Sequence, residues 1–197
     1  MSIFDETIQS ILRANNGYIT AAQAAKANVP GYCLSNMLAS GALYKVNRGI
    51  YALPEVWEDE MYFLQYRFSK GIFSHGTALY LHSMTDRTPH KYTMTFPHGY
   101  NPSSAKKQGI VAKVTSEFYK LGITEVASPC SNPLKAYDVE RTLCDIVRGR
   151  NADDIQLVNQ AMRVYAASSK KDIAKLIDYS EKLRVKSKIL RYMEVLL

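Results

Sequence analysis

The stretch Gly41–Pro54, GALYKVNRGIYALP, decides the fold of the N-terminal part of this 197-residue sequence. Its apolar, aromatic and β-branched residues suit two short strands, and Asn47, Arg48 and Gly49 suit the tight turn between them. We therefore expect a β-hairpin with Arg48 at its tip and Lys45 on the preceding strand. A basic tip of this kind either contacts a phosphate backbone or lies in solvent, and the segment alone does not distinguish the two.

The residues before the hairpin predict three helices. Apolar residues recur at helical spacing from Ile3 to Ala14, and Thr20 with Gln23 forms a capping-box pattern at the start of a second helix. A third helix is expected from about Tyr32 to Ser40. Three helices followed by a hairpin is the order of a winged helix-turn-helix, in which the third helix reads the major groove of DNA. We predict such a DNA-binding domain over residues 1–54.

The predicted DNA contacts are polar and basic positions of the third helix and the hairpin. They are Tyr32, Ser35, Asn36, Lys45, Asn47 and Arg48. A small domain of this type can also serve as a protein-interaction module. Only four basic residues stand against two acidic ones through Pro54. Each phosphate contact contributes about −0.9 to the salt dependence of binding, so a shallow dependence is expected unless a second copy or another basic segment contributes.

Residues 55–197 predict a larger α+β domain, with a mixed sheet over about 91–137 and a helical bundle over 138–197. A helix is expected to open at Glu55–Asp59, and Ser74 and Asp138 are expected to cap two later helices. A sheet of about five strands is a usual size. The strands are predicted at Lys91–Phe96, Ile110–Val114, Glu117–Leu121, Thr124–Ala127 and Leu134–Tyr137, and the last helices at Asp154–Ala167, Lys171–Leu183 and Lys186–Leu197.

The formal net charge of +7 is concentrated towards the C-terminus. From Arg141 onward there are 12 Lys and Arg against 7 Asp and Glu, a difference of +5. A basic helical surface can bind nucleic acid, an acidic protein or only solvent, and the density of cations here favours a partner. The residues concerned are Lys170, Lys171, Lys175, Lys182, Arg184, Lys186, Lys188 and Arg191.

Cysteine spacing and hydropathy indicate a cytoplasmic protein with no membrane segment. Cys33, Cys130 and Cys144 are odd in number and form no CxxC pair, which is typical of reduced intracellular thiols. The N-terminus has no signal-peptide pattern, and no apolar run approaches the roughly 20 residues that cross a bilayer. His75 and His82 can share a helix face, but no third ligand has zinc-like spacing, so we expect no metal and no cofactor.

Asp138 and Glu140, with Lys135, suggest an alternative function. Paired carboxylates beside a lysine occur in metal-dependent nucleases and other phosphoryl-transfer enzymes, which would make this chain an enzyme fused to a DNA-binding module. However, Asp138 is needed as a helix cap and no Glu-x-Lys triplet accompanies the pair. We therefore expect a protein without catalytic activity. A further alternative is an interaction protein whose basic tail docks an acidic partner.

Four blocks in order carry a family resemblance. They are the hairpin itself, SHGTALYLHSMTDRTP at residues 74–89, TMTFPHGYN at 93–101 and KAYDVERTLCDIVRGR at 135–150. Together they resemble the AbiEi-type antitoxins of bacterial type IV toxin-antitoxin systems, which act in abortive infection and phage resistance. The resemblance implies a winged-helix domain that represses its own operon by binding inverted repeats in double-stranded promoter DNA.

The resemblance also implies a C-terminal antitoxin domain. That domain counteracts a cognate nucleotidyltransferase toxin without forming a stable complex with it. The motif positions to which the resemblance points are Ser74, His75, Thr77, Asp86, Arg87, Asp138, Glu140 and Arg141.

Overall fold

The computed structural model describes residues 3–148 and 154–196, which form two compact units of a mixed α and β fold. The first unit contains the residues up to Leu64 together with Ser128–Asn132, and the second contains Gln65–Ala127 and the residues from Pro133 onward. The units thus divide after Leu64, whereas the sequence suggested a boundary after Pro54. The sequence predicts a helix over 139–150 (VERTLCDIVRGR) after Asp138; its last two residues, Gly149 and Arg150, lie outside the described residues, as does Leu197 of the last predicted helix.

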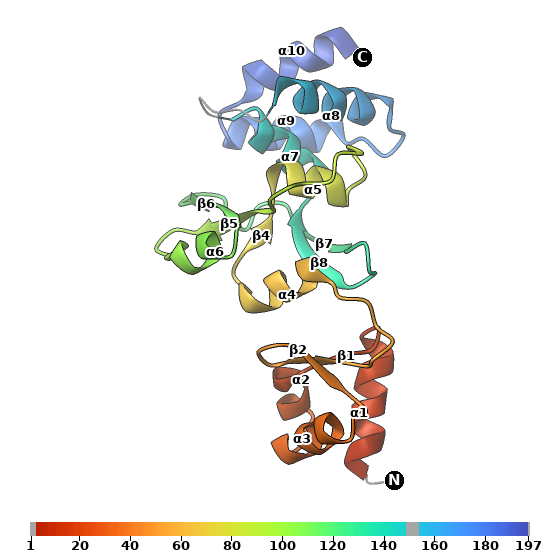
Figure 1. The fold of residues 1–197 in the computed structure, drawn as a ribbon. Helices are drawn as coiled ribbons and strands as arrows, with labels where there is room; N and C mark the ends of the chain where they lie inside the picture. The colour runs from red at the N-terminus through yellow and green to blue at the C-terminus, as the bar shows by residue number, and fades with distance from the viewer. Residues whose placement is uncertain (1–2, 149–153, 197) are drawn as a thin grey trace. The chain divides into compact units, whose positions relative to one another are not determined.

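The first unit consists of helices and a small antiparallel sheet (Figure 1). Its elements are α1 (Ile3–Ala14), β1 (Tyr18–Thr20), α2 (Ala21–Lys26), α3 (Gly31–Ala39), β2 (Tyr44–Asn47) and β3 (Ile50–Ala52). The strands are ordered β1-β3-β2. One apolar core joins these elements, including Ile8 and Leu12 of α1, Ile19 of β1, Leu34 of α3 and Leu43 before β2. The expected succession of three helices and a hairpin is present.

Local signals in the sequence explain the turns of this unit. The Thr20 hydroxyl accepts a hydrogen bond from Gln23 N, and the Gln23 side chain accepts one from Thr20 N, which confirms the predicted capping box. Gly49 has a φ of +74° in the hairpin turn, a conformation that glycine adopts without strain. At the same turn, Asn47 Oδ1 accepts a hydrogen bond of 2.7 Å from Arg48 N.

The segment Glu55–Asp59 is not helical, contrary to the sequence prediction. The helix α4 spans Glu60–Arg67, and Asp59 stands before it as a capping residue whose Oδ1 accepts a hydrogen bond from Tyr62 N. Its other oxygen accepts hydrogen bonds from the Ser128 hydroxyl and from Asn132 Nδ2. These bonds engage the buried Asp59 carboxylate just before the helix, which begins at Glu60.

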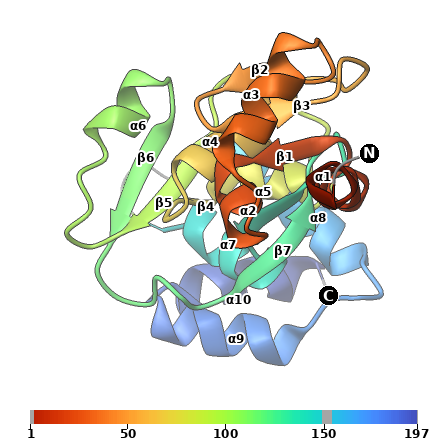
Figure 2. The same ribbon diagram turned by 90° about the horizontal axis from the view of Figure 1, so that it is seen from below.

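The second unit contains a five-stranded mixed sheet with the order β6-β5-β4-β8-β7. Figure 2 shows β5 and β6 on one side of the sheet and β7 on the other. β4 pairs in parallel with β8, and β5 pairs in parallel with β6, whereas the β4–β5 and β7–β8 pairs are antiparallel. The strands are β4 (Ile72–Phe73), β5 (Thr93–Pro97), β6 (Val111–Thr115), β7 (Ile123–Ala127) and β8 (Pro133–Tyr137).

One predicted strand of this sheet is wrong. Glu117–Leu121 forms bends and turns, and Phe118 has a φ of 55°, which no extended strand accommodates. The fifth strand is instead the two-residue β4, which is too short to give a periodicity signal. The predicted number of strands is therefore right although one member differs.

In the described part of the chain six helices lie wholly in the second unit, and α7 lies at the centre of their packing. α7 packs against α5, α8 and α9, and it contributes Leu143 and Ile146 to a core that includes Met162, Leu176 and Ile189. Within the described ranges, no helix is long and apolar enough to traverse a lipid bilayer. The helices are α5 (His75–Leu81), α6 (Ser103–Lys107, which the sequence did not predict), α7 (Val139–Ile146), α8 (Ile155–Ala167), α9 (Ile173–Lys182) and α10 (Lys186–Leu196).

Candidate functional site

The helix α3 has one buried and one exposed face in the first unit. Cys33 and Leu34 are buried in the core, whereas Tyr32, Ser35 and Asn36 are exposed. Tyr32 is 60% exposed and is therefore not a core aromatic residue. The Ser35 hydroxyl donates a hydrogen bond of 3.3 Å to the Gly31 carbonyl, which leaves the oxygen of Ser35 able to accept another. The outward face of α3 therefore presents hydrogen-bonding groups to solvent.

The hairpin presents cations to solvent in the same unit as α3. Lys45, Asn47 and Arg48 are exposed, whereas Ile50 and Ala52 of β3 are buried. The pairing register shifts between Lys45 and Asn47, a bulge that increases the local twist of the hairpin. Among residues 3–148 and 154–196, neither Lys45 nor Arg48 forms an ion pair. Both charges are thus available to an anionic partner, and the first unit offers a candidate nucleic-acid interface.

The eight motif positions in the second unit separate into three groups. His75 and Arg141 line one polar pocket, with the buried Ser74 in contact with His75 behind it. Asp138 and Glu140 belong to a carboxylate cluster, and Asp86 and Arg87 to an exposed loop. Thr77 stands apart, because its hydroxyl accepts a hydrogen bond of 2.9 Å from Thr93 N and so fixes α5 to the start of β5.

The polar pocket, called here the His75–Arg141 pocket, has a volume of about 320 Å³. It brings together α5, the strand pair β5–β6 and α7, which are distant in sequence. Its lining consists of His75, Thr95, Lys113, Val114, Thr115, Ser116, Arg141, Asp145 and Arg148.

Arg141 is the most firmly held side chain of the pocket, and it is only 1% exposed. Its Nε lies 3.0 Å from Asp145 Oδ2, its Nη1 donates a hydrogen bond of 2.6 Å to the Phe118 carbonyl, and its guanidinium carbon lies 4.4 Å from the centre of the Tyr137 ring. Burial raises the pKa of Asp145 above its ordinary value, and the adjacent Arg141 charge opposes that rise. The backbone at Gly122 approaches closely, since a Cβ there would lie 2.8 Å from Arg141 Cβ.

Ser74 and His75 form a hydrogen-bonded chain with Thr95. Ser74 occupies the N-cap position of α5, but its side chain makes no capping hydrogen bond, so the prediction that it caps the helix is wrong for the side chain. The hydroxyl instead accepts a hydrogen bond of 2.8 Å from the Thr95 hydroxyl and lies 3.2 Å from His75 Nδ1. Burial lowers the pKa of His75 to about 4, with the charges of Lys113 and Arg141 acting in the same direction. His75 is therefore neutral at neutral pH.

The carboxylates Asp138 and Glu140 share one lysine of α9 as their ion-pair partner. Lys175 Nζ lies 3.0 Å from Asp138 Oδ2 and 3.2 Å from Glu140 Oε2. Although its burial lowers the pKa of Lys175, the two carboxylates raise it above the ordinary value. Asp138 also accepts a hydrogen bond from Arg141 N, which confirms it as a helix cap. The phosphoryl-transfer alternative invoked Lys135, which is exposed and forms no ion pair with either carboxylate.

The remaining predicted positions are structural or exposed. Arg87 forms an exposed ion pair of 2.8 Å with Asp154, and Asp86 is exposed in the same loop. His82 Nε2 lies 2.8 Å from the Tyr137 carbonyl oxygen, so this ring is held by the backbone. In the part of the chain that the structure describes, no three His, Cys, Asp or Glu side chains form a metal-binding group.

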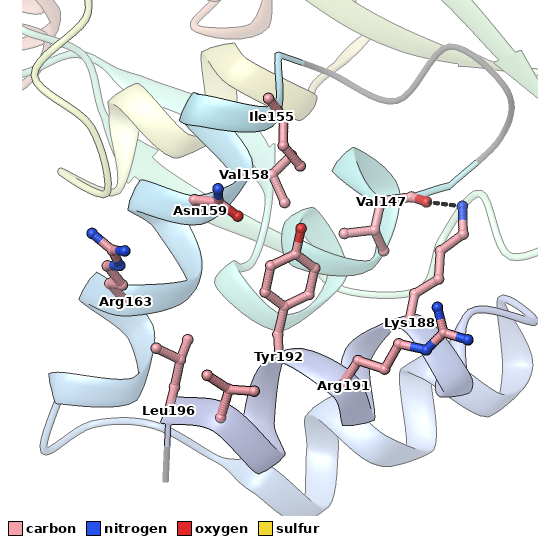
Figure 3. A pocket seen from close by; sticks show the side chains of 10 residues that line it. Val147, Ile155, Val158, Asn159, Arg163, Lys188, Arg191, Tyr192 and Leu196 are labelled. Carbon is pink, nitrogen blue, oxygen red and sulfur yellow. Dashed lines mark hydrogen bonds between the residues drawn. The ribbon is translucent and has the colours of Figure 1, made fainter.

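The basic C-terminal helices form a second, less polar pocket of about 520 Å³ between α8 and α10 (Figure 3). Val158 and Tyr192 contribute to its apolar lining, and Arg163, Lys188 and Arg191 add charge. Lys188 Nζ donates a hydrogen bond of 2.7 Å to the Val147 carbonyl and so satisfies a carbonyl just after α7. Several other cations of the tail form ion pairs within the unit, namely Lys175, Lys182 and Lys186.

Sequence reasoning missed Thr95, Lys113 and Arg148 as pocket residues. Thr95 and Lys113 are register partners across the parallel β5–β6 pair, and Arg148 follows α7. No local pattern in the sequence indicates this proximity, because it depends on which strands pair.

Comparison with known proteins identifies only the N-terminal part of the chain. Residues 6–54 match the family model described as "Transcriptional regulator, AbiEi antitoxin", and this range includes all six predicted DNA contacts. Comparison with proteins of curated function finds no match. A solved structure with detectable similarity is the crystal structure of the RV2827C protein from Mycobacterium tuberculosis, which is 12% identical with a TM-score of 0.46. The alignment covers 100% of this chain and 81% of that one, but a score this low does not establish a shared fold. The resemblance seen in the sequence is therefore confirmed over residues 6–54, the part of the chain that matches the model of the AbiEi antitoxin transcriptional regulators.

Proposed function

We propose that the chain is the antitoxin and autorepressor of a type IV toxin-antitoxin system that acts in abortive infection. The first unit serves as a winged helix-turn-helix: α3 enters the major groove, and the β2–β3 hairpin is the wing that contacts the neighbouring phosphates. The main observation in support is that α3 and the hairpin expose all six predicted contact residues while burying their apolar faces. The family match over residues 6–54 supports the same reading.

The DNA target of this proposal is the chain's own promoter. Two copies bound to inverted repeats double the number of phosphate contacts, which offsets the small number of cations in each first unit. In this arrangement Lys45 and Arg48 hold the backbone, while Tyr32, Ser35 and Asn36 contact base edges or phosphates.

The first half of the proposal is tested by gel shift with the DNA upstream of the gene over a range of salt concentrations. Arg48→Ala and Lys45→Ala should each reduce the slope of log K against log[salt] by about 0.9 per bound copy, which weakens binding about 3.5-fold more at 50 mM than at 200 mM salt. Arg13→Ala removes an exposed arginine from the last turn of α1 in the same unit and is the matched control. Wild-type slopes in both hairpin variants would show that the hairpin is not the wing.

The second unit, in this proposal, counteracts a nucleotidyltransferase toxin encoded beside the chain. Co-expression of the toxin with the full-length Lys45→Ala/Arg48→Ala variant, from an unrelated promoter, separates the two activities. We expect full relief of toxicity without promoter binding. If this variant no longer relieves toxicity, the two activities do not belong to separate units. In a separate pull-down at moderate salt, a stoichiometric complex of the chain with the toxin would contradict the type IV mechanism.

A further inference from the structure

We propose that the His75–Arg141 pocket of the second unit binds a phosphate group, either free or at the end of a nucleotide. The inference concerns the second unit alone and does not rest on DNA binding by the first.

The charge of the pocket favours an anion. Lys113, Arg141 and Arg148 contribute three positive charges, and Asp145 contributes one negative charge. Asp145 is only 6% exposed and is bonded to Arg141 Nε, so its carboxylate is occupied. Neither Lys113 nor Arg148 forms an ion pair with any described residue. An excess of unpaired cations in a concave site concentrates anions from solution.

The pocket is preorganised around a buried guanidinium. Arg141 is fixed by Asp145, by the Phe118 carbonyl and by the face of Tyr137, so little side-chain entropy remains to be lost on binding. Lys113 lies in the middle of β6, a regular strand, and not in a loop. A guanidinium and an ammonium are side-chain groups that proteins use to bind phosphate.

The hydroxyl groups and His75 add neutral donors. Because the Ser74 oxygen already accepts a hydrogen bond from Thr95, its own proton is available to His75 Nδ1. The neutral ring then carries its proton on Nε2 and can donate a hydrogen bond. Ser116, which follows β6, lines the same pocket with a further hydroxyl.

The size of the pocket agrees with this ligand class. Its volume of about 320 Å³ lies at the lower end of the roughly 300–1,000 Å³ that is usual for small-molecule sites. That space accommodates an inorganic phosphate with its water, or the phosphate end of a nucleotide whose remainder extends into solvent.

The test is a titration of the full-length protein with inorganic phosphate, followed by NMR of the histidine rings. The sequence contains four histidines, so a His75→Asn variant assigns the His75 signal, and the other three are internal controls. Asparagine is chosen because His75 has a φ of 53°, a region that asparagine tolerates. Bound phosphate should move the His75 signal and raise the pKa of His75 from about 4 towards its ordinary value.

Charge-removing variants at exposed positions test the cations without disturbing the fold. Lys113→Ala and Arg148→Ala should each weaken phosphate binding about tenfold or more. Lys135→Ala and Arg163→Ala remove the same charges from exposed positions of the same unit outside the pocket, and they should change the affinity less than about twofold. If the pocket variants and the control variants lose phosphate affinity equally, the binding depends only on the overall charge of the protein, and the proposal is wrong.

Adenosine monophosphate in a parallel titration distinguishes the two phosphate sources. Binding more than about tenfold tighter than inorganic phosphate assigns the site to a nucleotide, and equal binding assigns it to the free anion. If the His75 signal stays unchanged at millimolar concentrations of both ligands, the pocket is not a phosphate site.

Discussion

Replacement of Arg141 by methionine tests how the second unit tolerates a buried charge. The variant keeps a side chain of similar length but leaves the Asp145 carboxylate, which is 6% exposed, without its guanidinium partner. It also removes the donor to the Phe118 carbonyl and the cation above the Tyr137 ring. We expect a strong loss of stability although the methionine that replaces Arg141 is apolar and suits a buried position.

The expected magnitude follows from the unpaired acid. Removing one partner of a buried ion pair costs about 3–5 kcal/mol of unfolding free energy. The other interactions, with the Phe118 and Leu121 carbonyls and the Tyr137 ring, add less, since the Phe118 carbonyl belongs to a residue that is 39% exposed and can bind water instead. A domain with a typical unfolding free energy of about 5–15 kcal/mol would remain folded in water, but it would unfold at a much lower urea concentration.

The loss should depend on pH, and its sign is fixed by Asp145. Burial already raises the pKa of this acid, and removal of Arg141 raises it further. When an acid has a higher pKa in the folded than in the unfolded state, the folded state binds more protons, and stability falls as the pH rises between the two values. The cost of Arg141→Met is therefore smallest at and below the ordinary pKa of an aspartic acid, about 3.9, and largest above the raised pKa.

Urea unfolding followed by far-UV circular dichroism measures this cost, because most helices belong to the second unit. The double variant Arg141→Met/Asp145→Leu removes both charges and should recover at least half of the loss, since an apolar pair of similar volume can replace a buried ion pair. A cost below about 1 kcal/mol at every pH, or no recovery in the double variant, would refute the reasoning.

Three further predictions concern the first unit and use urea unfolding of the full chain. Gly17→Ala should lower the free energy of unfolding by more than about 1–2 kcal/mol, because Gly17 has a φ of +83° and an added Cβ would lie 2.3 Å from Val56 Cγ2. Gly41→Ala is the control: Gly41 has a φ of +74° but open space around it, so the substitution should cost only about 1 kcal/mol. Thr20→Ala breaks the capping box and should cost about 1 kcal/mol, whereas Thr20→Ser should restore most of it. Asp59→Ala leaves buried donors without an acceptor and should cost about 2–3 kcal/mol, and an unchanged transition would show that solvent replaces the carboxylate.

The first unit follows closely from the sequence because its signals are local. The Thr20–Gln23 capping box and the Asn47–Gly49 turn involve residues within a few positions of each other, so their geometry can be inferred without knowing the tertiary fold. The sequence left open whether Tyr32 is exposed or belongs to the core, because an aromatic residue at the start of a helix suits either place, and the structure shows it 60% exposed.

The second unit is less predictable because its sites depend on strand pairing. His75 and Arg141 meet only because β4 pairs in parallel with β8, and Lys113 joins them only through its register with Thr95. Local rules also failed where a tertiary contact competed with them. The Ser74 hydroxyl binds Thr95 instead of capping α5, and an isolated N-cap pattern cannot reveal such a competitor.

The position of β6 at the end of the sheet gives Lys113 another consequence. β6 pairs with β5 alone among the described strands, and its residues Val111 and Val114 are 39% and 47% exposed. An edge strand with exposed apolar side chains can pair with a strand of a second molecule. A lysine in the middle of such a strand commonly prevents this pairing. Removing Lys113 should therefore make the protein more prone to self-association. Concentrated samples of the variant should precipitate sooner on storage than the wild type, whether or not a ligand is present.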